Sequence, residues 1–255
     1  MANIFEATRP DDYLMRLAAS DLGQSYKAMA TAALDLAEGQ SVVDVGCGPG
    51  ADLLAFSAAV GPHGSVLGID HDADAVAAAR ELVGTAGNVK VSVGDAHVLD
   101  LEPESVDRAH TDRVLQHVAD PSRVVHELFR VLRPGGRAVL AEPDWGTLAI
   151  DGPDAATTNA YQAFVVQEVV HNSWIGRQLP GLAERAGFTV DRVVPVTAVF
   201  HDVNEADQVL GLGRVAERAR EAGYFTADVA RRWTDHLTTA RFFASVTLFV
   251  VALDR

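Results

Sequence analysis

The segment of residues 41–50 constrains the fold more than any other part of the sequence. It joins an apolar run, SVVDV, to a turn that carries glycine at every second position, GCGPG. Glycines in such a turn let the backbone bend sharply and let a ligand approach the main chain without meeting a Cβ. Helical spacing follows at residues 51–60. We therefore predict a strand, a tight turn and a helix, which is the repeating unit of an open α/β sheet.

The same alternation continues as far as Glu142. Short β-branched runs alternate with helical patterns, which is typical of a parallel sheet with helices on both faces. Two later runs, at residues 188–200 and 244–252, are rich in valine and aromatic residues and read as the last two strands, paired antiparallel. We predict a Rossmann-like, doubly wound α/β fold with a seven-stranded sheet, antiparallel strands at its end and helical insertions. The other elements expected are strands at 66–69, 89–93, 106–111 and 137–141, helices at 73–83, 121–132 and 175–186, and Asp72 as a helix cap.

Segments outside this pattern define the expected domain organisation. Residues 1–40 hold two amphipathic helix candidates, at 12–19 and 25–37, which we expect to cover the active site. Residues 41–255 form the main domain, with insertions at about 143–174 and 202–240 that act as lids. Their aromatic side chains are expected either to line a pocket or to form a core. These side chains are Trp145, Tyr161, Trp174, Tyr224, Phe225 and Trp233.

Composition restricts the partners and the compartment. The formal net charge is −14, a poor match for nucleic acid, which needs clustered cations. Cys47 is the single cysteine, so no internal disulfide is possible. The start of the sequence lacks the basic and apolar pattern of a secretory signal, and the most apolar stretch, residues 242–252, is shorter than a membrane-spanning helix. We expect a cytoplasmic protein with no membrane anchor and no nucleic-acid partner, and we leave its oligomeric state open, with a homodimer as one possibility.

Acidic residues follow the predicted strands. Asp44, Asp70, Asp95, Asp112 and Glu142 all stand at or near the carboxyl ends, where open α/β sheets bind their ligands. The glycine turn followed by an acid some 20 residues on also fits a dinucleotide-binding fingerprint. The negative charge of a pyrophosphate, however, would be repelled by Asp44, which stands only two residues before the first glycine, Gly46. We therefore favour a cationic nucleoside and keep an NAD-dependent oxidoreductase as the alternative.

Four segments carry a resemblance to a known family. They read VVDVGCGPG at 42–50, GID at 68–70, GDA at 94–96 and LRPGGRAVLAEP at 132–143. Together they resemble the class I S-adenosylmethionine-dependent methyltransferases, in particular the bacterial group that acts on quinones and other small molecules. The resemblance covers roughly residues 41–143 and is weak in both flanks. It implies S-adenosylmethionine as cofactor and transfer of its methyl group to a small organic molecule. Oxygen is our first expectation for the methylated atom, and carbon or nitrogen remains open.

The resemblance also implies roles for residues of the first two strand ends. Asp44 would face the methionine ammonium, directly or through water. The main chain of Gly46 and Gly48 would lie beside the methionine and the ribose. Asp70 would accept hydrogen bonds from both ribose hydroxyls, and His71 would lie beside the adenine.

Residues after the third and fourth strands complete the implied cofactor site. Asp95 would accept from the adenine amino group, and the main chain of Ala96 would contact a ring nitrogen. Arg113 would present its backbone to the methionine moiety. The sequence has Asp112-Arg113 where many amine and nucleic-acid methyltransferases carry Asn/Asp-Pro-Pro-aromatic, which argues against a nucleobase or protein-amide substrate.

A catalytic base is the remaining expectation. Because the cofactor's methyl group is already activated, alignment dominates the catalysis, and a general base would add to it. His117 is our candidate base and Glu142 our candidate for orienting it, with a packing role for His117 as the alternative. No metal site is expected, since the histidines show no metal-binding spacing. A protein that keeps this fold and cofactor without transferring a methyl group is a further alternative.

Overall fold

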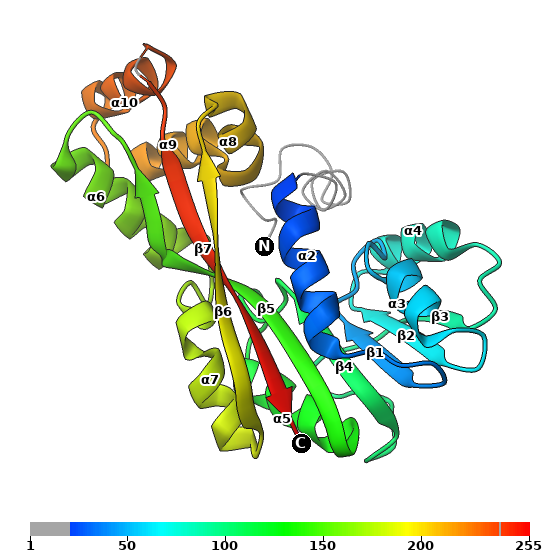
Figure 1. Cartoon of the computed structure of the whole chain (residues 1–255). Helices are drawn as coiled ribbons and strands as arrows, with labels where there is room; N and C mark the ends of the chain where they lie inside the picture. The colour runs from blue at the N-terminus through cyan, green and yellow to red at the C-terminus, as the bar shows by residue number, and fades with distance from the viewer. Residues whose placement is uncertain (1–20, 240) are drawn as a thin grey trace.

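The computed structural model describes residues 21–239 and 241–255 as one seven-stranded sheet flanked by helices (Figure 1). The strand order is β3-β2-β1-β4-β5-β7-β6. The strands are β1 (Ser41–Val45), β2 (Ser65–Asp70), β3 (Val89–Val93), β4 (Val106–Asp112), β5 (Leu132–Ile150), β6 (Thr189–Phe200) and β7 (Ala244–Asp254). Strands β1 to β5 pair in parallel, and β7 lies antiparallel between β5 and β6. The predicted sheet, with its antiparallel pair of last strands, is confirmed.

The described helices include those predicted at 51–60, 73–83, 121–132 and 175–186, with similar bounds, and one at 21–34 where 25–37 was predicted. They are α2 (Asp21–Leu34), α3 (Leu53–Val60), α4 (Ala73–Val83), α5 (Pro121–Val131), α6 (Ala155–Phe164), the π-helix η1 (Val165–Val169), α7 (Ile175–Ala186), α8 (Val203–Leu210), α9 (Leu212–Glu221) and α10 (Ala227–Thr239). Asp72 caps α4, because its carboxylate accepts a hydrogen bond from Asp74 N at 2.8 Å. The predicted helix at 12–19 lies outside the described residues. None of the described helices combines the length and the apolar character that crossing a membrane would require.

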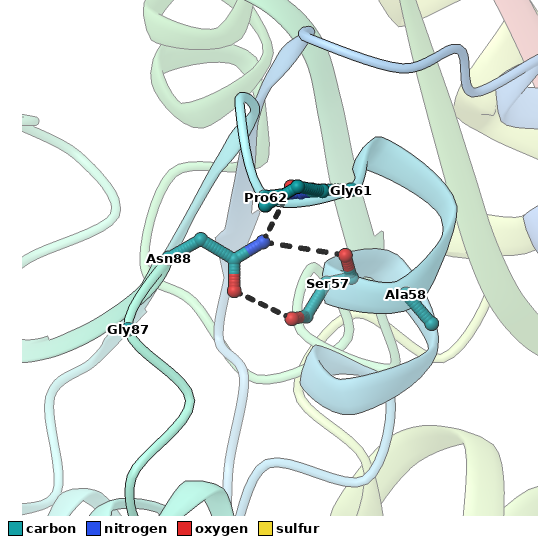
Figure 2. A pocket seen from close by; sticks show the side chains of 6 residues that line it. All are labelled: Ser57, Ala58, Gly61, Pro62, Gly87 and Asn88. Carbon is teal, nitrogen blue, oxygen red and sulfur yellow. Dashed lines mark hydrogen bonds between the residues drawn. The ribbon is translucent and has the colours of Figure 1, made fainter.

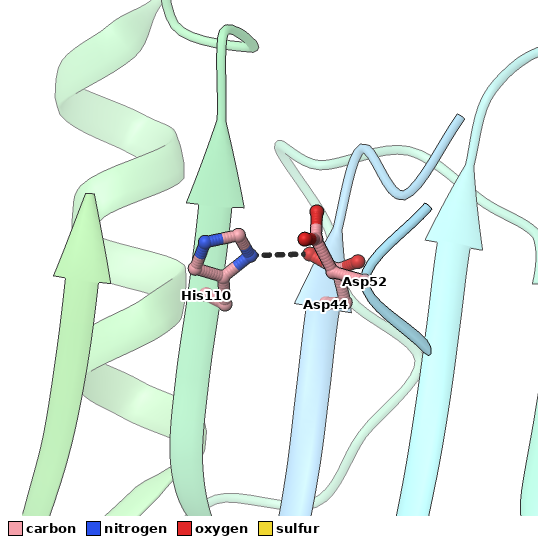
Figure 3. Close-up of side chains that lie close together, drawn as sticks. All are labelled: Asp44, Asp52 and His110. Atoms are coloured by element: carbon pink, nitrogen blue, oxygen red, sulfur yellow. Dashed lines mark hydrogen bonds and ion pairs between the residues drawn. The ribbon is translucent and has the colours of Figure 1, made fainter. Parts of the chain in front are cut away.

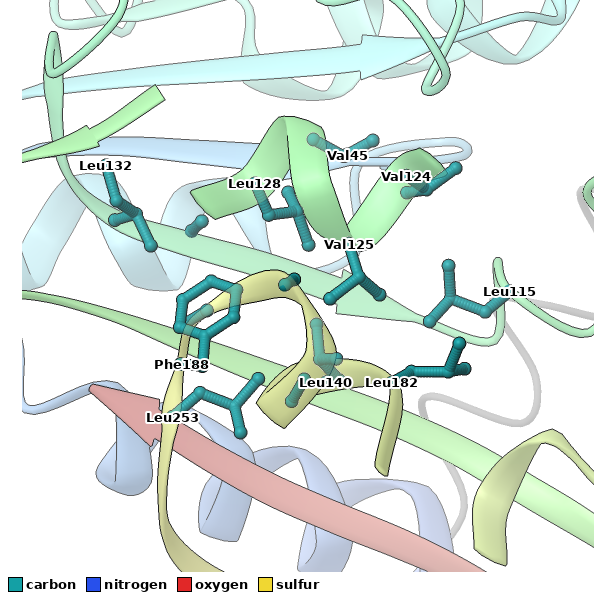
Figure 4. Packing of buried hydrophobic residues seen from close by; sticks show 14 of the residues in the cluster. Val45, Leu115, Val124, Val125, Leu128, Leu132, Leu140, Leu182, Phe188 and Leu253 are labelled. Carbon is teal, nitrogen blue, oxygen red and sulfur yellow. The ribbon is translucent and has the colours of Figure 1, made fainter. Parts of the chain in front are cut away.

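Helices cover both faces of the parallel half of the sheet. On one face, α2, α3 and α4 bury side chains such as Leu34, Phe56 and Val76 against the sheet. On the other face, α5 and α7 contribute Leu128 and Leu182 to a core (Figure 4). This arrangement confirms the doubly wound architecture and leaves the carboxyl ends of β1 to β4 free of crossing strands.

A separate apolar core lies at the far end of β5, β6 and β7. It is closed by α6, η1, α8, α9 and α10. Within it the rings of Tyr161 and Trp233 stack with centroids 4.5 Å apart, and Phe225 packs against both. These three side chains are buried. They therefore form a core, which was the alternative to a pocket lining, whereas Trp174 is half-exposed.

Strand β5 corrects one prediction. We expected it to end at Ala141, with Glu142 at its tip and an insertion from residue 143. Instead β5 continues to Ile150 and Glu142 lies near its middle. The reason is β7, which pairs with β5 beyond the last β4 contact and places Pro143 opposite Leu248. The first insertion therefore begins after Ile150.

Candidate cofactor and active site

The glycine turn after β1 is closely packed against neighbouring segments. The amides of Gly46 and Cys47 both donate to the carbonyl of Ile69, at 2.7 and 3.0 Å. Gly46 has φ +75°, and a Cβ there would lie 2.2 Å from a methyl group of Val114. Glycine is thus required at this position by both backbone conformation and space. The turn ties the ends of β1 and β2 to the loop after β4.

Asp70 connects this turn to the end of β2. Its carboxylate accepts from Gly48 N at 2.8 Å and from Asp72 N at 3.0 Å. The imidazole of His71 lies 3.2 Å from the same carboxylate and is almost fully exposed. The Asp70 carbonyl accepts from Gly94 N at 2.9 Å, which links β2 to the turn after β3. The backbone thus brings the implied ribose and adenine residues to one edge of the sheet.

Asp95 and His97 form a pair on that edge. Asp95 Oδ1 accepts from His97 N at 2.9 Å and lies 2.7 Å from His97 Nδ1. Since His97 Nε2 accepts from Asp120 N at 3.2 Å, the proton of the neutral ring is on Nδ1 and points at Asp95. The backbone and side chain of His97 hold the pKa of Asp95 below its usual range. The Asp95 side chain is 65% exposed, so the ionised carboxylate can accept further hydrogen bonds.

Asp44 is buried in β1 and pairs with a histidine that the sequence analysis did not single out. His110 of β4 places Nδ1 2.8 Å from Asp44 Oδ1, and Asp52 lies beside them (Figure 3). Ligand atoms of Asp44, Asp52 and His110 all lie within 4.8 Å of one another, a spacing that could hold a metal ion. The ammonium of Lys27 lies 2.5 Å from Asp52, so a side-chain cation already balances this carboxylate.

Helix α2 closes over these acids. Lys27 Nζ lies 2.6 Å from Asp112 Oδ2, and Tyr26 donates its hydroxyl to the same oxygen at 2.9 Å. Burial would raise the pKa of Asp112, but Lys27 and Arg113 hold it well below its usual range. Sequence analysis did not find Lys27 or Asp52, because their role depends on contacts between segments far apart in the chain. The only local pattern that could have pointed to Lys27 is its place beside Tyr26 on an amphipathic helix.

Glu142 binds the loop that follows β4. Its carboxylate accepts from the amides of Val114 at 2.7 Å, Leu115 at 2.5 Å and Gln116 at 3.3 Å. Burial raises the pKa of Glu142 to about 8, against the opposing effect of these backbone hydrogen bonds. The contacts are with the backbone of the loop rather than with the His117 imidazole. Glu142 therefore holds the backbone of the loop. Any effect of Glu142 on His117 is indirect and passes through this backbone.

The loop is also held from its other side. The side-chain amide of Asn172 donates to the carbonyls of Leu115 and Val118, both at 2.8 Å. The backbone N–H of Asn172 donates to the carbonyl of Gln116. Between these anchors His117 is exposed. Although part of the residue remains exposed, the protein packed around its ring removes hydration, and this effect, followed by repulsion from Arg113, His71 and His171, lowers the pKa of His117 to about 4. The ring is therefore neutral at physiological pH.

Arg113 begins this loop in a conformation that few side chains adopt. It has φ +58°, and its amide donates to the carbonyl of Ala141 at 2.8 Å. Its side chain lies 3.3 Å from the Asp112 carboxylate. Ala96, the remaining implied cofactor residue, is half-buried directly after Asp95. The predicted site residues thus gather at the carboxyl ends of β1 to β4 or on the loop after β4, apart from Glu142 within β5.

A surface depression at the opposite edge has a different character. It has a volume of about 600 Å³ and lies where α3 ends and β3 begins (Figure 2). Its polar groups satisfy one another, since Asn88 donates to the carbonyls of Ser57 and Gly61 and accepts from the Ser57 hydroxyl. The strand-end edge, by contrast, presents carboxylates whose acceptor capacity suits hydroxyl, amino and ammonium groups of a ligand.

The comparison with protein families identifies this arrangement. Residues 36–187, more than half of the chain, match the family described as "Methyltransferase domain". The chain belongs to this methyltransferase family. Class I methyltransferases of this kind use S-adenosylmethionine, which carries the hydroxyl, amino and ammonium groups that these carboxylates suit. The family match decides against the NAD-dependent oxidoreductase that the glycine turn left open.

Similar proteins agree with this assignment. The methyltransferase is 51% identical over 250 residues to an uncharacterized 37.1 kDa protein in transposon TN4556 of Streptomyces fradiae, covering 97% of this chain and 72% of that protein. It is 33% identical to demethylmenaquinone methyltransferase of Shouchella clausii, over 50% of this chain and 55% of that protein. A SAM-dependent methyltransferase from Aquifex aeolicus has a similar structure, with a TM-score of 0.55 and 25% identity, covering 74% of this chain and 94% of that one. The chain thus spans about half the length of its quinone-methylating relative.

Proposed function

We propose that this enzyme transfers the methyl group of S-adenosylmethionine to an oxygen of a small organic acceptor. The observation that carries the proposal is the convergence of Asp44, Asp70 and Asp95 at the carboxyl ends of three adjacent parallel strands, beside the glycine turn. The similarity to a demethylmenaquinone methyltransferase supports a small, quinone-like acceptor. We expect a cytoplasmic enzyme.

The residues at this edge would hold the cofactor by complementary hydrogen bonds and charge. Asp70, already oriented by the amides of Gly48 and Asp72, would accept from the ribose hydroxyls. Asp95, held ionised by His97, would accept from the adenine amino group. Asp44 would offer negative charge to the ammonium. When bound, S-adenosylmethionine supplies a methyl group on a sulfonium that is a good leaving group.

His117 would act as the general base for the acceptor hydroxyl. Its imidazole is neutral at physiological pH and so has a lone pair that can accept a proton, while a pKa of about 4 in the free enzyme makes it a weaker base than an ordinary histidine. Its position is fixed indirectly, since Glu142 and Asn172 hold the backbone on either side of it. Glu142 is therefore a positioning residue in this proposal. The acceptor oxygen would be aligned by the surrounding site for in-line attack.

Cofactor binding and product analysis test the proposal separately. Calorimetry should detect binding of S-adenosylmethionine but not of NAD, and Asp70→Asn should weaken binding by about tenfold or more, because the charged acceptor is lost. Exposed Asp74, also on the β2–α4 side, gives Asp74→Asn as a matched control with unchanged affinity.

Incubation with a panel of phenols, hydroquinones and amines should then give a product heavier by one methylene group. Fragmentation of that product locates the methylated atom. Cofactor binding without any methylated product would favour the non-methylating alternative, and absence of binding would overturn the proposed function.

A further inference from the structure

The histidine in the middle of β4 is an unusual feature for a strand buried between two others. His110 is 2% exposed and is the direct cross-strand neighbour of Asp44 in β1. Its Nδ1 atom lies 2.8 Å from Asp44 Oδ1, and Asp44 is also 2% exposed (Figure 3). A buried polar pair of this kind is retained only when both partners are satisfied, since either one alone would be costly.

Packing fixes the ring of His110. The Phe56 ring of α3 meets it edge-on, with centroids 5.2 Å apart and an interplanar angle of 77°. Since His110 cannot turn away without disturbing this contact, its Nδ1 stays aimed at Asp44. The Asp44 carboxylate is in turn held two residues before the glycine turn. The position of this carboxylate therefore depends on His110.

Charged and polar side chains from α2, from the residue before α3 and from the end of β4 lie near the pair. Asp52 precedes α3, Asp112 ends β4, and Lys27 and Tyr26 reach in from α2. Burial alone would lower the pKa of His110, but Asp44, with Asp52 and Asp112, raises it above its ordinary value. The imidazole can therefore carry a proton near neutral pH, and its charge then opposes that of Asp44.

We propose that His110 is a positioning residue for the cofactor: it holds the Asp44 carboxylate toward the glycine turn, and its protonation sets how much negative charge this carboxylate offers to the cofactor's ammonium. This inference rests on the proposed function, in which Asp44 faces that ammonium. With His110 protonated, the pair is neutral overall. With His110 neutral, the negative charge of Asp44 is no longer balanced by its partner, and a cation nearby favours the ionised carboxylate over the protonated form toward which burial shifts the pKa of Asp44.

Linkage fixes the direction of the effect. A cation that binds beside Asp44 favours neutral His110, so binding releases a proton in the pH range where free His110 is protonated. Affinity for S-adenosylmethionine then rises with pH through that range, by at most about tenfold per pH unit for one released proton. Above the pKa of His110 the imidazole is already neutral. Binding then releases no proton from His110, and His110 no longer makes the affinity for S-adenosylmethionine depend on pH.

Calorimetry with S-adenosylmethionine measures both the binding affinity and the number of protons released on binding. The wild-type enzyme is titrated from about pH 5.5 to about pH 7, a range in which the cofactor's own α-amino group, with a pKa near 8, stays largely protonated, in buffers of different ionisation enthalpy, which gives the number of protons released. His110→Asn places an amide N–H near the Nδ1 position and cannot titrate. His126→Asn makes the same change on exposed α5, where the ring lies 2.7 Å from the carbonyl of Ser122, and is the matched control.

The inference predicts a pattern across these three proteins. Wild type and His126→Asn should release a proton and bind more tightly as pH rises. His110→Asn should bind with an affinity that this pH range does not change. A His110→Asn protein that keeps the wild-type pH dependence would overturn the inference while leaving the proposed function intact. If the His110→Asn protein does not fold, the wild-type measurement alone still tests the inference. Binding of the cofactor without proton release would overturn the inference. Absence of binding at any pH would overturn the proposed function as well.

Discussion

The ammonium of Lys27 lies 2.6 Å from a carboxylate oxygen of Asp112, and this ion pair joins α2 to the end of β4. Lys27 also lies 2.5 Å from Asp52, so one buried cation balances two acids. The side chains of all three residues are at most 13% exposed. Removing the cation would leave two carboxylates unpaired in a poorly solvated place.

We therefore expect Lys27→Met to destabilise the fold by about 3–5 kcal/mol, the usual cost of breaking a buried ion pair from one side. Urea unfolding measures this loss. Lys90→Met, at the exposed position 90 of β3, is the matched control and should change stability by less than about 0.5 kcal/mol. Equal stability of the two variants would show that Lys27 contributes nothing to the docking of α2.

Comparing Gly46 with Gly39 distinguishes the two ways in which an added Cβ destabilises the fold, namely backbone strain and steric overlap. Both have positive φ, at +75° and +85°, but a Cβ at Gly46 would lie 2.2 Å from Val114 whereas none of the surrounding atoms lies within 4 Å at Gly39. Gly39→Ala should cost about 1–2 kcal/mol through backbone strain alone. Gly46→Ala should cost more and should also weaken cofactor binding. Thermal unfolding and calorimetry of the two variants check this, and equal costs would contradict the role of Val114.

Glu142 should make stability fall as pH rises. Burial raises its pKa in the folded protein from 4.5 to about 8. The protonated form is thus favoured by folding, so its contribution is complete below about pH 4.5 and is lost by about pH 8, roughly 5 kcal/mol at most. Melting temperatures measured across this range should fall less in Glu142→Gln than in wild type. Glu81→Gln, at an exposed position of α4, should follow the wild-type curve.

His117→Ala should lower kcat by about 10²- to 10⁴-fold if His117 is the general base, with cofactor affinity unchanged. Because the pKa of His117 is about 4, its base form predominates above about pH 5. At saturating cofactor, kcat of the wild type should therefore be independent of this group from pH 5 upward. His63→Ala, on the exposed turn before β2, is the control. A variant of His117 with full kcat would leave the imidazole only a packing role.

Local patterns predicted most of the parallel half of the sheet. Each strand there is a short run bounded by turn residues, and caps such as Asp72 act through neighbouring amides. The end of β5 was predicted wrongly because the pattern changes after Glu142, and the residues from Pro143 onward read as a loop and a helix. Beyond Ala141, however, β5 has lost β4 as a neighbour and pairs only with β7, and a proline is tolerated on such an edge.

The implied cofactor acids could be located from sequence because each stands at or near the carboxyl end of its own strand. The partners of those acids could not be predicted in the same way. His110 pairs with a residue 66 positions away, and Lys27 with one 85 positions away. Such contacts follow from strand order and helix docking, which local periodicity does not contain. The same holds for Glu142, whose hydrogen bonds to the loop after β4 require β4 and β5 to be adjacent.

The length of β5 and β7 has a mechanical consequence. Both strands pass from the parallel half of the sheet into the core closed by α6 to α10; β7 stays paired with β6 along this path, whereas its pairing with β5 shifts register between Asp144 and Ala149. No flexible connection separates the two cores along these strands. Opening of the helical part would therefore have to twist or bend a hydrogen-bonded ribbon, so we expect its motions to be coupled to the sheet and its excision to expose the apolar faces of three strands rather than to leave an intact smaller enzyme.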